Sequence, residues 1–129
     1  GSFQAVKHRC AEMMVKVEAL RSAVYGAAAQ AAGNADTATL TLECAMAKAL
    51  AGDALFWSAA EAIQLHGGVG FTWEYDPQLY FKRAQASSHW LGDSDALREV
   101  IANALFASPP SAGQDPLCSI EAARLFLII

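Results

Sequence analysis

The residues best suited to chemistry lie in a glycine-rich stretch near the middle of the chain, which reads Gln64-Leu65-His66-Gly67-Gly68-Val69-Gly70. Three glycines in four positions disfavour a stable helix, so we expect a loop that needs unusual backbone angles or a close approach to another group. Without Cβ atoms, such a backbone can come within hydrogen-bonding reach of a phosphate or a ribose. The stretch matches neither a P-loop nor a dinucleotide-binding fingerprint, because no strand precedes it.

The histidines indicate no metal site and no clear base. His8 lies in a Lys-His-Arg run that is typical of a solvated face, and His66 stands at the end of a predicted helix, where histidine is usually structural. His89 has no carboxylate neighbour in sequence. None of the three has the spacing of a metal ligand, so we predict no metal site.

Composition predicts a single core-rich domain. The chain has 129 residues, of which 54% are hydrophobic and 17% charged, and a net charge of -4. That balance gives no electrostatic reason to expect nucleic acid. No uninterrupted apolar run is long enough to span a membrane, and no secretory signal opens the sequence. Three widely spaced cysteines, Cys10, Cys44 and Cys118, are typical of buried thiols in a reducing compartment, so we expect a cytoplasmic protein.

Hydrophobic periodicity predicts two long helices. The first runs from Phe3 to about Ala32 and ends at Gly33-Asn34, and the second runs from about Asp36 to Leu65. Small and apolar residues fall on nearly every face of the second helix, as in a helix contacted from several sides. The apolar stripe of the first helix recurs every three or four positions, at Phe3, Val6, Cys10, Met13, Val17, Leu20 and Val24.

Two shorter helices follow the glycine-rich stretch. Asp76-Pro77 predicts a third helix, with Asp76 as its N-cap, that ends near His89. A turn at Gly92 to Asp95 then leads to a fourth helix that ends at Phe106. The sequence therefore predicts an all-α fold, an up-down four-helix bundle over residues 1–106. Residues 107–129 are expected to be a linker and an apolar C-terminal tail that must bury against this bundle, another domain or another subunit.

From Gln64 to Thr72 the sequence resembles the C-terminal helical domain of the acyl-CoA dehydrogenase family. The resemblance recurs in order along residues 3–106, at Phe3-Gln4-Ala5-Val6-Lys7-His8, at Ala47-Lys48-Ala49 through Gly52-Asp53, and from Gln64 through Tyr80 and Arg83-Ala84 to Arg98. It implies FAD as cofactor, an acyl-CoA substrate, and assembly into a homo- or hetero-oligomer. In that family a glutamate removes the α proton of the thioester while FAD takes the β hydride. The N-terminal helical and central β-domains of the family are missing here, so we expect the isolated chain to be inactive.

The resemblance also implies which residues meet the cofactor. Gln4 falls where the family contacts FAD across a dimer interface. Gln64, Gly67 and Gly68 fall in the stretch that approaches the FAD of a neighbouring subunit. The turn that contains Asp93 and Asp95 also touches FAD in the family, but the acidic side chains are a poor match for a pyrophosphate, because the family usually carries threonine and glutamine there.

Leu91 stands where most members of the family place the catalytic glutamate. Leucine cannot accept a proton, so we predict no catalytic residue in this chain. Three functions remain open at this stage: a dehydrogenase whose base lies elsewhere, a non-catalytic partner subunit of a heteromeric dehydrogenase, and a flavin monooxygenase or oxidase of the same fold.

Overall fold

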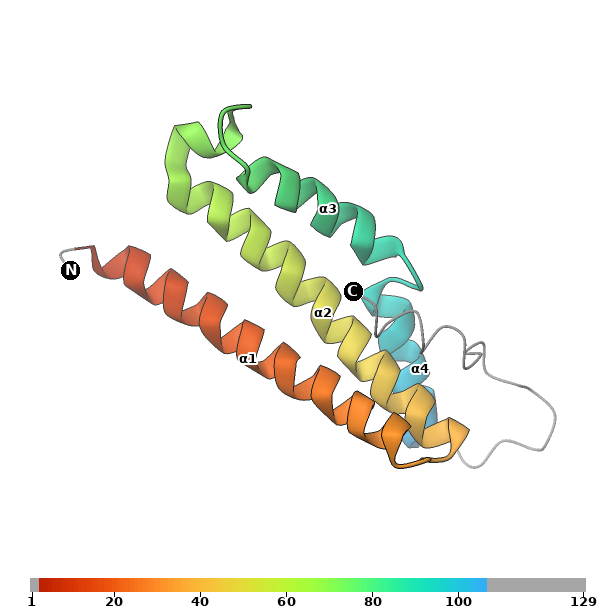
Figure 1. The fold of residues 1–129 in the computed structure, drawn as a ribbon. Coiled ribbons are helices and arrows are strands. Elements are labelled where there is room, and N and C mark those ends of the chain that lie inside the picture. The colour runs from red at the N-terminus through yellow and green to blue at the C-terminus, as the bar shows by residue number, and fades with distance from the viewer. Residues whose placement is uncertain (1–2, 107–129) are drawn as a thin grey trace.

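The computed structural model describes residues 3–106, and all of the regular structure within that range is helical (Figure 1). The elements are α1 (Gln4–Ala32), α2 (Thr37–His66), a short 3-10 helix η1 (Gly67–Phe71), α3 (Pro77–His89) and α4 (Ser94–Phe106). The predicted all-α fold of four helices is confirmed. The proposed linker and tail, residues 107–129, lie outside the described range.

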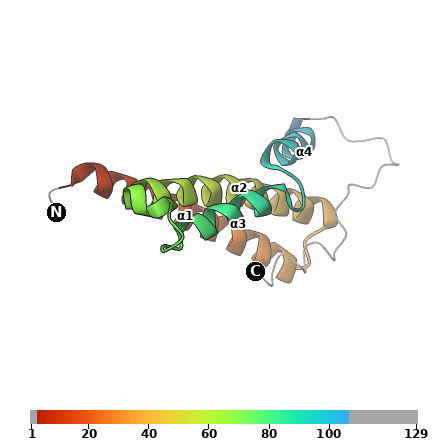
Figure 2. The same ribbon diagram turned by 90° about the horizontal axis from the view of Figure 1, so that it is seen from above.

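Helix α2 is the centre of the fold, and α1, α3 and α4 pack chiefly against it rather than against one another. α1 and α2 form a long antiparallel hairpin (Figure 1). α3 follows the second half of α2, where the rings of Phe56 and Phe81 lie 5.2 Å apart between their centroids. α4 begins beside the middle of α2, and Figure 2 places it on a different side of α2 from α3.

The core is made of alanine. The buried apolar residues of the described range are Ala27, Ala45, Ala47, Ala49, Ala54, Ala59 and Ala84, and most of them belong to α2. Alanine projects only a Cβ, so neighbouring backbones can approach closely, and it is also the best helix former. The expectation that the second helix is contacted from several sides is confirmed.

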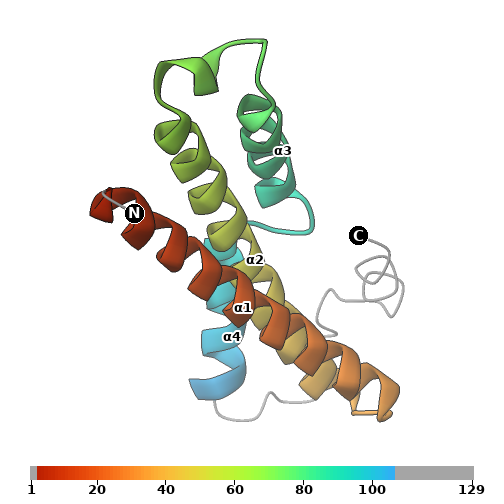
Figure 3. The ribbon, with the colours of Figure 1, turned by 60° about the vertical axis from the view of Figure 1, so that its left-hand side comes forward.

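Only part of the apolar stripe predicted for α1 is shielded from solvent. Met13, Leu20 and Val24 are half-buried against the hairpin, whereas Phe3 is 76% exposed. Val6 and Cys10 are exposed as well, which makes the expectation of buried thiols wrong for Cys10. The reason is geometric, because α1 and α2 diverge toward the N-terminus of α1 (Figures 1 and 3).

Asp36, Asp76 and Asp93 each precede the first turn of a helix, and the side chains of Asp36 and Asp93 cap theirs. The carboxylate of Asp36 accepts hydrogen bonds from the Thr39 hydroxyl at 2.7 Å and from the Thr39 amide at 3.0 Å, and these bonds lower the pKa of Asp36. Asp93 accepts from the Ala96 amide at 2.8 Å. Asp76 occupies the N-cap position of α3 as predicted, but its side chain makes no cap hydrogen bond, because its own backbone is already helical (φ -76°, ψ -18°). Pro77, which fixes φ in the first turn, begins α3 as predicted.

The glycine-rich stretch is a single 3-10 turn rather than an open loop. Gly67 has a φ of +64° and ends α2, as a glycine after a helix commonly does. Gly70 is buried, and a Cβ there would lie 2.7 Å from the carbonyl oxygen of Ile63. Gly68 requires glycine for neither reason, because its φ is not positive and nothing lies within 4 Å of a Cβ at that position.

We predict that Gly70→Ala lowers the free energy of unfolding of the chain by about 1–3 kcal/mol, because the new Cβ meets backbone that cannot move aside freely. Gly68→Ala is the matched control, with the same substitution two residues away in open space. Urea unfolding followed by circular dichroism compares the two variants. Equal stability of Gly70→Ala and Gly68→Ala would contradict the close approach of Gly70 to α2.

Candidate functional site

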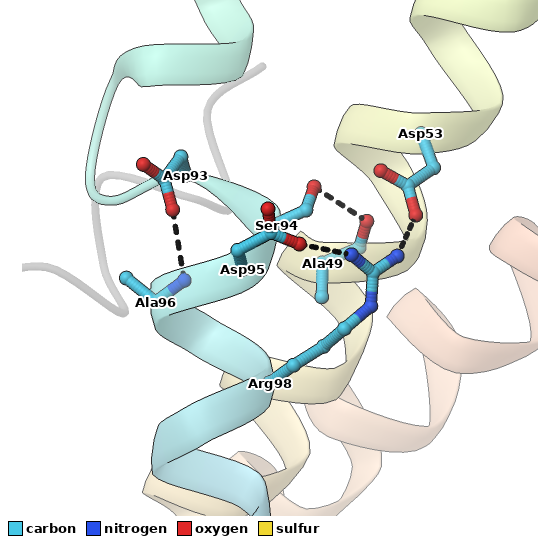
Figure 4. Close-up of polar contacts among 7 residues, drawn as sticks. All are labelled: Ala49, Asp53, Asp93, Ser94, Asp95, Ala96 and Arg98. Atoms are coloured by element: carbon cyan, nitrogen blue, oxygen red, sulfur yellow. Dashed lines mark hydrogen bonds and ion pairs between the residues drawn. The ribbon is translucent and has the colours of Figure 1, made fainter.

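The candidate residues fall into two groups at different places along α2. Gln4, Gln64, Gly67 and Gly68 lie at the end of the hairpin where α1 begins and α2 ends, which we call the open end (Figure 1). Leu91 and Asp93 lie in the turn between α3 and α4. Asp93 and Asp95, which is in the first turn of α4, lie beside the middle of α2 (Figure 4). From residue 49, which contacts this turn, to residue 64 the helix rises about 22 Å. One chain therefore does not bring the two groups into one pocket.

The open end presents exposed polar groups. Gln4, Gln64, Gly67 and Gly68 are all exposed. An ion pair between Arg9 Nε and Glu61 Oε2, at 3.5 Å, joins α1 to α2 about one turn before Gln64. Because no atoms surround the Cβ position of Gly68, its backbone is open to the approach of a ligand.

Neighbouring residues of the open end have structural or aromatic roles. The Nδ1–H of His66 donates to the Ala62 carbonyl at 2.7 Å, which agrees with the structural role expected from the sequence. Phe71 and Trp73 are 79% and 83% exposed, and Lys82 Nζ lies 4.4 Å from the centre of the Trp73 ring. Exposed aromatics beside open glycine backbone are typical of a surface that another molecule covers.

The carboxylates of Asp93 and Asp95, at the start of α4, each accept a hydrogen bond from another residue of this chain (Figure 4). Asp93 caps α4 through the Ala96 amide, and Asp95 Oδ1 accepts from Arg98 Nη1 at 2.8 Å. Arg98 also pairs with Asp53 of α2 through its other terminal nitrogen. The ion pairs of Arg98 offset part of the negative charge at this turn.

Leu91 adopts a left-handed backbone conformation, with φ of +63°, and Gly92 follows it with φ of +101°. The left-handed region is unfavourable for a branched residue such as leucine, and strain of this kind collects at functional sites. The Leu91 side chain is 42% exposed and has no proton acceptor. The turn therefore presents position 91 on a strained backbone without supplying a base.

Lys48 is a further polar residue whose structural role the sequence pattern does not reveal. It lies on α2 between two buried alanines, and its Nζ donates to the Ser87 carbonyl at 2.9 Å. Burial lowers the pKa of Lys48. A lone lysine within an alanine-rich helix was the available signal, but only the packing of α3 identifies its partner.

The described residues 3–106 contain no group of three histidine, cysteine, aspartate or glutamate side chains placed to hold a metal ion. Within the same range, no helix has the length and apolar character needed to cross a membrane.

Comparison with known proteins identifies a family. The sequence family described as acyl-CoA dehydrogenase, C-terminal domain, matches residues 1–106. The chain is 46% identical over 101 residues to acyl-CoA dehydrogenase IpdE2 of Mycobacterium tuberculosis, covering 78% of this chain and 28% of the relative. It is 43% identical to acyl-CoA dehydrogenase FadE34 of the same organism, covering 79% of this chain and 14% of the relative. The chain thus spans little more than a quarter, or less, of these relatives.

Solved structures agree with the sequence comparison. Butyryl-CoA dehydrogenase from Megasphaera elsdenii superposes with a TM-score of 0.75 at 29% identity, over 81% of this chain and 26% of that one. A chain from the structure of the electron transferring flavoprotein of Acidaminococcus fermentans gives a TM-score of 0.77 at 31% identity, over 83% of this chain and 27% of that one. The chain therefore belongs to the acyl-CoA dehydrogenase family, and residues 1–106 correspond to its C-terminal domain.

Proposed function

We propose that this chain is the C-terminal domain of an FAD-dependent acyl-CoA dehydrogenase, where it supports flavin binding and oligomer assembly for the α,β-dehydrogenation of an acyl-CoA thioester. The observation that carries the proposal is the family match over residues 1–106, joined to an open end whose Gln64, Gly67 and Gly68 are all exposed. The free thiol of exposed Cys10 supports a reducing compartment, the cytoplasm.

The open end has the chemistry that a dinucleotide needs. The Gln64 amide can donate and accept hydrogen bonds, and the backbone at Gly68 has no side chain to keep a phosphate or ribose away. Gln4 lies at the same end of the hairpin and adds a second amide. When bound, FAD would accept the β hydride of the substrate, and the residues of this chain would hold the cofactor.

Asp93 and Asp95 are the weaker part of the cofactor proposal. Carboxylates repel a pyrophosphate, but Asp95 is paired with Arg98 and Asp93 is turned toward its own helix amide. Because Arg98 is shared by Asp53 and Asp95, the turn keeps a net negative charge and fits a pyrophosphate poorly. We retain both residues as candidates whose contact with FAD occurs in the assembled protein.

Oligomer assembly follows from the apolar surface of the chain. Large side chains that a folded domain normally buries are exposed on several elements, among them Phe3, Tyr25, Tyr80, Leu105 and Phe106. Exposure on this scale marks surfaces that meet another domain or another subunit. The missing domains and partner subunits of an intact dehydrogenase would cover them.

A second candidate is favoured by Leu91. Because position 91 offers no base, the chain also suits a non-catalytic subunit that lends its open end to the flavin of a catalytic partner in a heteromer. Under either proposal position 91 supplies no base, so we expect residues 1–129 alone to have no dehydrogenase activity.

We predict that Gly68→Ala in the full-length protein lowers FAD occupancy, because a Cβ at position 68 intrudes on the cofactor. The substitution meets no atom of this chain, so the fold of the domain should be unaffected. Gly26→Ala on α1, which also meets no atom within 4 Å, is the control. Occupancy is read from the ratio of flavin to protein absorbance after gel filtration. Unchanged flavin content in Gly68→Ala would exclude Gly68 from the cofactor site.

The residue at position 91 separates the two candidates. If the full-length protein is a complete enzyme with a vacated base position, Leu91→Glu raises the rate at which acyl-CoA reduces an electron acceptor. Leu91→Gln, which has nearly the same shape but cannot take the proton, leaves that rate unchanged. If the chain is a partner subunit, neither variant alters the rate of the heteromer. An equal increase in both variants would contradict a role as base at this position.

A further inference from the structure

The turn between α3 and α4 is held from both sides by neighbouring residues of α2. Before the turn, Lys48 Nζ donates to the carbonyl of Ser87 at 2.9 Å. After the turn, the Ser94 hydroxyl donates to the carbonyl of Ala49 at 3.3 Å (Figure 4). Two consecutive residues of one helix thus fix the two ends of the segment 87–94.

The hydrogen bond from Lys48 joins α2 to the C-terminal turn of α3. The Ser87 carbonyl lies in the last turn of α3, where carbonyl groups lack helical partners and carry partial negative charge. The same oxygen accepts from the Trp90 amide at 3.3 Å. Lys48 and Trp90, the residue before Leu91, therefore donate hydrogen bonds to the same carbonyl oxygen.

After the turn, the start of α4 packs closely against α2 at Gly52. A Cβ on Gly52 would lie 3.0 Å from the Ser94 hydroxyl, so α4 begins as close to α2 as the missing side chain permits. One turn further along α4, Arg98 pairs with Asp53. α4 contributes no buried residue, so these polar contacts have an unusually large share in holding its start.

We propose that Lys48 is a positioning residue, which together with Ala49 and Gly52 fixes the turn at residues 90–94 and thereby the backbone of position 91, the vacated base position of the proposed function. The inference rests on the proposed function for its flavin part and on the contacts of Lys48 for the rest. Leu91 stays in the left-handed region because both ends of its turn are anchored. When the Lys48 amino group is removed, one anchor is lost and the strained backbone relaxes.

The test uses Lys48→Met in the full-length protein with its flavin, because methionine keeps the apolar stem and removes the ammonium donor. We expect the Trp90 backbone amide, which donates to the same Ser87 carbonyl, to exchange with deuterium about tenfold faster, as the loss of one hydrogen bond from a charged donor allows. Lys16→Met is the matched control: Lys16 also packs on α2, with Nζ 4.7 Å from the centre of the Trp57 ring. Lys48→Arg should restore slow exchange, since it keeps a charged donor.

A second readout separates this inference from the proposed function. We expect Lys48→Met, but not Lys16→Met or Lys48→Arg, to shift the visible absorbance and circular dichroism of the bound flavin. Unchanged exchange of the Trp90 amide in Lys48→Met, or an equal change in Lys16→Met, would overturn the positioning role. Faster exchange with an unaltered flavin spectrum would overturn the link to the flavin site and leave the proposed function standing. A full-length protein that holds no flavin would overturn the proposed function and the flavin link together, while the exchange result would still decide the anchoring.

Discussion

The structure depends on one constraint: α2 must be contacted by three other helices along its length. Only small side chains allow several backbones to approach a single helix, and the buried residues of α2 are all alanine. Glycine continues the same rule at Gly52, beside the start of α4, and at Gly70, against the last turns of α2. The alanine content of the sequence is therefore a packing requirement as well as a helix preference.

The same constraint determines where the large apolar side chains lie. Because alanine fills the contacts with α2, residues such as Phe3, Trp73 and Phe106 have no place in the interior and remain on the surface. The matched region makes up 28% of acyl-CoA dehydrogenase IpdE2 and 26% of butyryl-CoA dehydrogenase, so most of each of those proteins lies outside it. Polar groups add to this packing: Lys48 joins the last turn of α3 to α2, and Ser94 joins the start of α4, a helix without buried residues, to the Ala49 carbonyl.

Much of this was predictable from local sequence. Periodicity and breakers placed all four helices, because patterns at Gly33-Asn34 and Asp76-Pro77 act within a few residues. Two failures are local, because Asp76 makes no side-chain cap and the glycine-rich stretch forms a 3-10 helix. The others involve long-range geometry. The divergence of α1 from α2 exposes Phe3 and Cys10, which a one-dimensional stripe cannot show. Nor does sequence reveal that the partner of Lys48 is a carbonyl thirty-nine positions later. The cofactor contacts of Gln4, Gln64, Gly67, Gly68, Asp93 and Asp95 stay predictions, since they involve groups supplied by other parts of the assembly.

The most direct test of this account is amide hydrogen exchange, compared between the isolated chain and the full-length assembled protein. If α2 organises the fold and partners cover its outer elements, residues 45–59 exchange slowly in both samples. Residues 3–10 and 67–75 then exchange rapidly in the isolated chain and become protected only on assembly. Equal protection of residues 3–10 and 67–75 in the two samples, or rapid exchange of residues 45–59 in the isolated chain, would contradict the account.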